Sequence, residues 1–331
     1  EQEYEKISYK KGLIKEGEML IKKNQLIDSE SFQKLYSYKK ELTNYLNQRD
    51  FKYIFLGNFM FTFLILLICY LFLISYYKSI LISNASFLLI SSIILFFVCF
   101  STFIVTFDSD LIFAIPFCII PLSLRAFFDL KISLFVHFFT ILIISFLCTK
   151  SQLFFVIFFL AGISSVISPK KIYTQSKLMF TILRIVLIFF ITLTSVLLLT
   201  TGSLEQADFK IILMLCLSAV LTFLTFPFIY VCEKVFNLIS DLSLLEYADT
   251  NTDLLRKLAK EAPGTFHHSL QVSHLCESVA IEIDANPLLV RAGALYHDIG
   301  KLSNPNFFIE NQTVSFNPHD DLSFDESAKL I

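Results

Sequence analysis

Charged residues are scarce in this sequence. Only 17% of the 331 residues are Asp, Glu, Lys or Arg, whereas 55% are hydrophobic and 38 are Phe. Because a soluble domain must keep a wetted surface, this balance excludes a wholly soluble protein. The formal net charge is also small, at −2, so the total charge gives no reason to expect nucleic acid as a partner.

Paired cysteines and a signal peptide are missing as well. The seven cysteines show no paired spacing, which argues against a disulfide framework or a zinc knot. The sequence starts at Glu1 and has no short apolar stretch with a cleavage site behind a basic start, so no signal peptide is visible. We therefore expect a piece of a longer protein.

Apolar residues concentrate between Tyr53 and Cys232. A helix needs about 20 apolar residues to cross a bilayer, and about 17 are tolerated. The third candidate segment is the weakest, because Pro116 and Pro121 would kink or break it, and six spans is the alternative count. The sequence thus predicts an all-α, polytopic membrane bundle of about seven spans, at about 53–76, 80–106, 111–128, 132–148, 152–168, 178–201 and 209–232.

The charges of the short loops indicate an orientation. Basic residues of short loops favour the cytoplasmic side of a membrane, and here they occupy alternate loops. Four basic residues just before the first span argue the other way, but a folded domain translocates largely regardless of its charge. We expect an extracytoplasmic amino end and a cytoplasmic carboxyl end. The basic loops hold Lys78, then Arg125 and Lys131, then Lys170, Lys171 and Lys177; the others hold Asp108 with Asp110, Lys150, and Glu205.

Two segments flank the predicted bundle. Residues 1–52 mix Lys and Glu, and Glu18–Ile27 has the pattern of two short strands around a turn. We expect 1–52 to be the end of a mixed extracytoplasmic domain, with a solvated stalk as the alternative. After the last span, the apolar spacing over 233–262 predicts a linker helix that couples the membrane region 53–232 to the following domain, 263–331.

The last domain should be all-α. Its pattern predicts a helix from His267 to about Ile283, a second from Pro287 to Gly300, and a third over Ser323–Ile331. His297 and Asp298 are adjacent near the end of the second helix, and Lys301 follows them. Imidazole and carboxylate together suit a divalent metal, and a carboxylate can bridge two ions. Lys301 can meet a phosphate as a point charge.

Several motifs of this region resemble the seven-transmembrane receptor family with an intracellular HD hydrolase domain, of the PgpH type. The resemblance is nearly continuous from Leu244 to Gln312. Its strongest stretches are Ala262-Pro263-Gly264-Thr265-Phe266-His267-His268-Ser269-Leu270, Asn286-Pro287-Leu288-Leu289-Val290-Arg291, Tyr296-His297-Asp298-Ile299-Gly300-Lys301 and Phe307-Phe308-Ile309-Glu310-Asn311-Gln312.

This resemblance implies a function and a site. Members of the family have an extracytoplasmic domain, seven spans in the bacterial inner membrane and a cytoplasmic HD domain that linearises cyclic di-AMP with two divalent metal ions, Mn or Fe. It implies that His268, His297 and Asp298 are metal ligands, and we expect Asp298 and Lys301 to take part in catalysis. The family pattern has further ligands downstream of Ile331, so we expect the HD domain to be truncated here and these 331 residues alone to be inactive. An unknown extracytoplasmic ligand and a homodimer are further expectations.

Alternatives stay open at this point. The HD domain can act on another nucleotide, such as guanosine tetraphosphate or cyclic di-GMP, or it can be a non-catalytic receptor that binds nucleotide. Among the other histidines, a site role and a structural role are equally expected for His267 next to the ligand. A structural role is expected for His274, a surface contact for His319, and a hydrogen bond to a neighbouring helix for His137.

Overall fold

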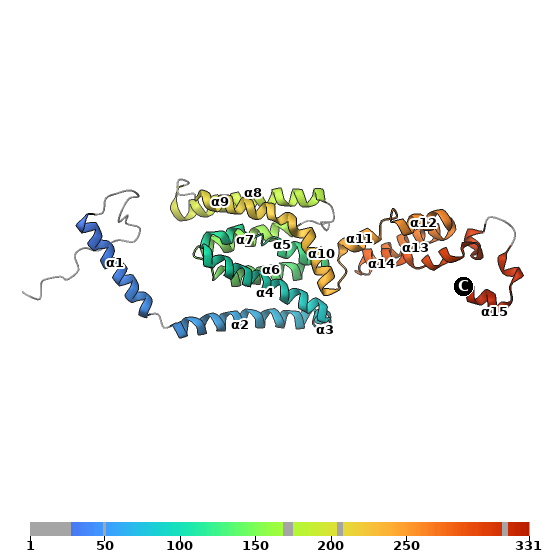
Figure 1. Cartoon of the computed structure of the whole chain (residues 1–331), viewed down its shortest axis with the longest axis horizontal. Helices are drawn as coiled ribbons and strands as arrows, with labels where there is room; N and C mark the ends of the chain where they lie inside the picture. The colour runs from blue at the N-terminus through green and yellow to red at the C-terminus, as the bar shows by residue number, and fades with distance from the viewer. Residues whose placement is uncertain (1–27, 49–50, 168–174, 204–207, 313–316, 331) are drawn as a thin grey trace, which may run out of the picture. The chain divides into compact units, whose positions relative to one another are not determined.

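The structure is a computed structural model that describes residues 28–48, 51–167, 175–203, 208–312 and 317–330. Every element in these residues is an α-helix or a 3-10 helix (Figure 1), which confirms the all-α fold for this part of the chain. The two strands expected in Glu18–Ile27 lie outside the described residues. The chain divides into two compact units, 1–66 and 67–331.

The first unit holds α1 (Ser29–Gln48) and the first part of α2 (Phe51–Tyr76). The carboxylate of Asp28 caps α1 by accepting a hydrogen bond from the backbone N–H of Ser31 at 2.9 Å. Hydrogen bonds from Ser31 lower the pKa of Asp28 below its ordinary value. α1 is amphipathic only in part, since Phe32 and Tyr36 stack on its exposed surface with ring centroids 6.4 Å apart.

The second unit begins with a bundle of apolar helices. Five segments of the described chain are long and apolar enough to cross a membrane: Phe55–Tyr76, Asn84–Phe107, Ser109–Phe127, Ser176–Thr201 and Phe209–Phe236. Two further apolar helices, Leu130–Ser145 and Ser151–Val166, are shorter. They occupy the fourth and fifth expected spans, but their 16 residues each fall just below the length of about 17 residues that a crossing requires.

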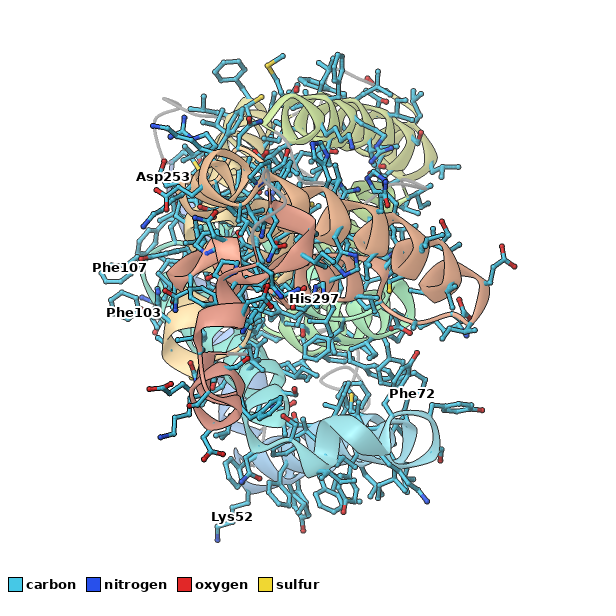
Figure 2. The ribbon with its side chains drawn as sticks, turned by 90° about the vertical axis from the view of Figure 1, so that its right-hand side faces the viewer. Lys52, Phe72, Phe103, Phe107, Asp253 and His297 are labelled. Carbon is cyan, nitrogen blue, oxygen red and sulfur yellow. The ribbon has the colours of Figure 1, made fainter. Side chains whose placement is uncertain are left out.

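The elements of the bundle follow in chain order. After α2 come α3 (Lys78–Ile82), α4 (Asn84–Phe107), η2 (Ser109–Ala114), α5 (Ile119–Phe127), α6 (Leu130–Ser145), α7 (Ser151–Val166), α8 (Gln175–Thr201), α9 (Phe209–Leu221), η3 (Thr222–Leu224) and α10 (Thr225–Phe236). Phe103 and Phe107 of α4 point away from the ribbon in Figure 2 and are exposed. Such side chains suit a surface that faces lipid.

The third segment is broken around Pro116, as predicted, whereas Pro121 lies within the first turn of α5. η2 ends at Ala114, and α5 begins only at Ile119. The interruption leaves the carbonyl of Ile115 outside both helices, where it accepts a hydrogen bond from the Ser218 hydroxyl of α9 at 2.9 Å. Non-helical backbone at membrane depth is tolerated only where protein satisfies its polar groups. The break therefore lies in the core, beside the fully buried Phe113 and Phe117.

Aromatic rings fill the centre of the bundle. Phe117 makes edge-on contacts with Phe154 and Phe158 of α7, with ring centroids 5.3 and 4.9 Å apart. The buried His137 of α6 is bonded to this helix too, through Nε2 and the Phe158 carbonyl at 3.0 Å, as expected from the sequence. Gly162 makes this possible, because a Cβ there would lie 1.9 Å from the same nitrogen.

Ion pairs join the loops at one end of the bundle. Lys150 Nζ lies 3.1 Å from Asp110 Oδ1 and 3.3 Å from Asp208 Oδ2. Lys210 pairs with Asp108 in the same cluster. At the other end of α4, the Tyr77 hydroxyl donates to Asp129 at 2.5 Å. Successive apolar segments consequently run back and forth between two ends.

The linker is not the continuous helix that the sequence predicts over 233–262. α10 stops because Asn237 adopts the left-handed conformation, at φ 52°. Glu233 Oε1 then accepts bonds from Ser240 N at 2.8 Å and from the Ser243 hydroxyl at 2.7 Å, while the Ser240 hydroxyl caps the next helix. Two short helices replace the long one, α11 (Asp241–Tyr247) and α12 (Asp253–Glu261).

Two adjacent helices dominate the last region, α13 (Pro263–Glu282) and α14 (Pro287–Tyr296). α13 starts four residues before His267, because Pro263 acts as its first residue and not as a breaker. α14 ends at Tyr296, earlier than expected, and 3-10 turns follow. The rest comprises η4 (Ile299–Ser303), η5 (Pro305–Phe307), η6 (Ile309–Asn311), η7 (Pro318–Asp321) and α15 (Phe324–Leu330), which agrees with the helix expected there.

Candidate metal centre

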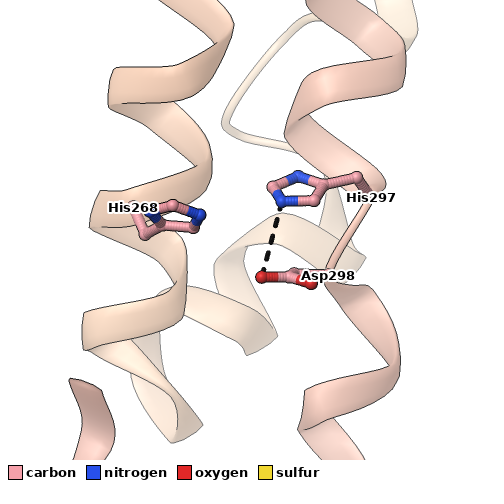
Figure 3. A group of neighbouring side chains, drawn as sticks. All are labelled: His268, His297 and Asp298. Atoms are coloured by element: carbon pink, nitrogen blue, oxygen red, sulfur yellow. Dashed lines mark ion pairs between the residues drawn. The ribbon is translucent and has the colours of Figure 1, made fainter. Parts of the chain in front are cut away.

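His268, His297 and Asp298 come together between α13 and α14. His268 lies in the second turn of α13, and His297 caps the carboxyl end of α14 with Asp298 next to it. Figure 3 shows the His268 ring facing His297 and Asp298 across the space between the two helices. The imidazole centroids are 5.6 Å apart. Asn286 fixes where α14 begins, since its side chain accepts bonds from Leu288 N and Leu289 N.

The geometry of these three side chains fits a divalent metal ion. One ligand atom from each lies within 4.8 Å of the others, and His297 Nε2 is 3.4 Å from Asp298 Oδ2. His297 Nδ1 lies 2.7 Å from the Ala294 carbonyl. When Nδ1 donates this hydrogen bond, the lone pair of Nε2 faces Asp298 and is available to a metal. In the described ranges of the chain, this is the one group of three such donors.

Lys301 lies beside this group, between two carboxylates. Its Nζ is 2.8 Å from Asp298 Oδ2 and 2.7 Å from Glu310 Oε1. Burial alone would lower the pKa of Lys301, but its hydrogen bonds to Asp298 and Glu310 outweigh this and raise the pKa above its ordinary value. Burial alone would raise the pKa of Glu310, yet bonds from Lys301 and Thr265 lower it. Both groups are therefore charged at neutral pH.

A polar network, buried at Thr265 and Asn311, continues from Glu310 to α13. Thr265 donates its hydroxyl to Glu310 Oε1 at 3.1 Å. Its backbone N–H donates to Asn311 Oδ1 at 3.0 Å, and Asn311 Nδ2 donates back to its hydroxyl at 2.8 Å. Gly264 permits this approach, because a Cβ there would lie 1.8 Å from the Glu310 carbonyl oxygen. Sequence reasoning gave these residues no role, although all four belong to the motifs that carry the resemblance.

The other histidines of this region stay outside the group. His267 and His274 are exposed, and the His267 ring lies beside Phe266, with centroids 5.8 Å apart. Both ring nitrogens of His319 are occupied, Nε2 by the Phe307 carbonyl at 2.9 Å and Nδ1 by the Ser327 hydroxyl at 2.6 Å. His319 thus joins η5 to α15.

These features define a class of protein: a helical membrane protein with a candidate metal site built from histidine and aspartate on a helical domain. The family model described as "7TM receptor with intracellular HD hydrolase" matches residues 52–240, more than half of the chain, and the HD domain model matches residues 265–330. The chain belongs to the family of 7TM receptors with an intracellular HD hydrolase. The HD domain is the domain of a metal-dependent hydrolase family, in agreement with the ligand types found here.

Two curated relatives are named cyclic-di-AMP phosphodiesterase PgpH. The protein from Bacillus subtilis (strain 168) is 37% identical over 179 residues, which are 53% of this chain and 25% of that protein. The protein from Listeria monocytogenes serotype 1/2a (strain 10403S) is 48% identical over 99 residues, 30% of this chain and 14% of that protein. This chain thus spans a quarter or less of the length of both relatives.

A solved structure is similar over a short part of the chain. It is the crystal structure of the L. monocytogenes PgpH HD domain in complex with cyclic-di-AMP, with 49% sequence identity. The match covers 25% of this chain and 38% of that one, with a TM-score of 0.24.

Proposed function

We propose that the protein carrying this chain is a membrane-bound, metal-dependent phosphodiesterase that hydrolyses a cyclic dinucleotide, cyclic di-AMP in particular. The observation that carries the proposal is the group of His268, His297 and Asp298, within 4.8 Å of one another in the region that the HD model matches. The substrate is supported by the names of the two relatives, whose identity to this chain is 37% and 48% over the matched residues.

Each residue of the site has a role in this proposal. His268, His297 and Asp298 would be ligands of two divalent metal ions, Mn or Fe. Bound divalent metals lower the pKa of water and stabilise charge on phosphoryl oxygens. Asp298 would contribute carboxylate oxygens to these ions. Lys301, whose ammonium is 2.8 Å from Asp298, meets a phosphate of the substrate as a point charge.

The proposal includes an arrangement in the bacterial plasma membrane. The bundle crosses seven times, with 1–52 outside and the HD domain in the cytoplasm, joined by 233–262. One support is the pair of contacts from Lys150 to Asp110 and Asp208, which bring alternate loops together at one end of the bundle. The other is the basic residues of the remaining loops, which favour the cytoplasmic side. Reporter fusions after Lys177 and at Ile331 should both report cytoplasm, and opposite locations would contradict seven crossings.

A substrate comparison tests the activity. The full-length protein, purified with Mn or Fe, is offered cyclic di-AMP, cyclic di-GMP and guanosine tetraphosphate in separate reactions, and the products are separated by chromatography. We expect cyclic di-AMP to be converted to a linear dinucleotide fastest. Hydrolysis of guanosine tetraphosphate alone would assign a different hydrolase, and binding of cyclic di-AMP without hydrolysis would assign a receptor.

A further inference from the structure

Lys301 has two carboxylate partners of different kinds. Asp298 belongs to the candidate metal group, whereas Glu310 does not. The distances from Lys301 Nζ to the two carboxylates are nearly equal, at 2.8 and 2.7 Å. A carboxylate oxygen that ligates a metal is less able to accept a hydrogen bond from an ammonium group. The bond to Glu310 involves no candidate ligand, so it is the contact that holds Lys301 independently of the metal.

The ion pair between Lys301 and Glu310 is partly shielded from solvent. The side chains are 22% and 28% exposed, and the ammonium lies 5.0 Å from the centre of the Phe308 ring. Surface ion pairs gain little because two mobile side chains must be ordered. Here the Lys301 side chain is already restrained, because it contacts two carboxylates and one aromatic ring.

Glu310 is itself fixed from α13. Thr265, which is fully buried, donates its hydroxyl to the oxygen that Lys301 also contacts. Thr265 is in turn bonded by Asn311 at both its backbone N–H and its hydroxyl. Thr265 stands one turn before His268 on the same helix. One chain of polar contacts thus connects the helix that carries His268 to the ammonium beside Asp298.

We propose that Glu310 is a positioning residue: anchored by Thr265, it holds the Lys301 ammonium beside the metal group where a phosphate of the substrate binds. This inference rests on the proposed function. A lysine side chain is flexible and loses much rotamer freedom when it is fixed. A donor that is held in place before the substrate arrives stabilises developing charge better than a mobile one. Glu310 supplies this order without touching metal or substrate.

The test is a double-mutant cycle in the full-length protein. Glu310→Gln keeps the shape of the side chain and an oxygen that can accept from Thr265, but it removes the charge that holds Lys301. Wild type, Glu310→Gln, Lys301→Ala and the double variant are compared for kcat and KM with cyclic di-AMP, for bound metal per chain, and for the Kd of cyclic di-AMP with metal-free protein. Glu282→Gln, on the exposed end of α13, is the matched control.

We expect Glu310→Gln to lower kcat about tenfold, the size of one lost charge-assisted contact, with unchanged metal content. In the Lys301→Ala background, Glu310→Gln should have no further effect on kcat. In the wild-type background, Glu310→Asp, which keeps the charge, should have a higher kcat than Glu310→Gln. Independent, multiplying effects of the two substitutions, or loss of metal in Glu310→Gln, would overturn the positioning role, because Glu310 would then act on the fold or on the ligands.

The binding measurement separates this inference from the proposed function. If the wild type fails to hydrolyse cyclic di-AMP, the proposed function fails, and the Kd values still decide the role of Glu310. Equal weakening of binding in Glu310→Gln, Lys301→Ala and the double variant supports positioning. The same Kd in all four proteins, or no binding to the wild type, contradicts it.

Discussion

The membrane bundle and the HD region are held together in different ways. In the bundle, one continuous cluster of buried apolar residues runs from α2 to α10, and buried hydroxyls bond to carbonyls of their own helix, as Thr140 and Ser165 do. In the described residues of the linker and the HD region, the core cluster is small: its buried members are Ala248, Leu255, Leu258, Ala262 and Leu295. Polar contacts between segments far apart in the sequence, such as those of Thr265 with Asn311, supplement this apolar core.

The two regions therefore differ in the interactions that determine how their helices pack. Apolar packing orders the bundle, and most of its buried hydroxyls bond to carbonyls of their own helix. Ser218 and His137 are exceptions, since they bond to carbonyls of other segments. In the HD region, a few buried polar groups determine how the turn at 309–311 lies against α13. Removing one partner of such a pair leaves the other unsatisfied. A polar substitution should therefore cost much more in the HD region than in the bundle.

The largest effect is expected for Gly264→Ala. The new Cβ would lie 1.8 Å from the backbone oxygen of Glu310, and backbone cannot turn aside as a side chain can. We expect the 309–311 turn to separate from α13, with a loss of more than about 3 kcal/mol in the opening free energy of this region. Hydrogen exchange of the backbone amides in this region measures the opening free energy.

Gly293→Ala is the matched control for that substitution. Gly293 lies inside α14, and nothing is within 4 Å of a Cβ placed there. Alanine favours a helix over glycine by about 1 kcal/mol, so this variant should open less readily than wild type. If both glycine variants behave alike, the close approach of Glu310 to α13 is not what orders the turn.

Asn311→Ala should have the next largest effect. The substitution leaves Thr265 without partners for its buried N–H and removes the bond that its hydroxyl accepts, at a cost of about 2–3 kcal/mol. Ser165→Ala in the bundle removes a hydroxyl that is equally buried but bonded only to Gly162 of its own helix. We expect a loss of about 1 kcal/mol or less there, since no buried donor is left without a partner. Equal losses in unfolding experiments would break the contrast between the two regions.

Gly162→Ala should have the smallest destabilising effect of the glycine and asparagine variants. The added Cβ meets the ring of His137 and not backbone, so the ring can move, at the loss of its bond to the Phe158 carbonyl. We expect the free energy of unfolding, measured for the protein in detergent micelles, to fall by about 1–2 kcal/mol. His137→Ala combined with Gly162→Ala should then cost no more than His137→Ala alone, whereas additive costs would show that the two residues do not interact.

Much of the architecture could be predicted from local sequence. Pro116 marks the break before α5, and Pro287 correctly marks the start of α14. α13 was expected too, but it begins four residues before His267, and α14 ends four residues before Gly300. The interruption of the linker at Asn237 was missed, because the apolar stripe continues across it while one residue adopts a left-handed conformation. α6 and α7 were each expected to be one residue longer and to end later, at 148 and 168 instead of Ser145 and Val166, since apolar residues extend past the ends of the helices.

The candidate site was predictable only where a motif carries its chemistry. His297 and Asp298 are adjacent in sequence, and His268 belongs to a stretch that resembles a known family. Glu310 and Asn311 lie 45 and 46 residues from the Thr265 they contact, and no periodicity relates such positions. Their roles depend on how a 3-10 turn packs against α13, which only the three-dimensional structure reveals.

We propose that His268, His297 and Asp298 form a metal site that supports hydrolysis of cyclic di-AMP. The most direct test compares wild type with Asp298→Ala in the full-length protein, measuring bound metal per chain and cyclic di-AMP turnover on the same samples. His274→Ala, an exposed histidine of α13 outside the group, serves as the control. We expect Asp298→Ala to insert into the membrane but to lose metal affinity and turnover by more than about 100-fold, while His274→Ala keeps both. Wild-type metal content and turnover in Asp298→Ala would contradict it.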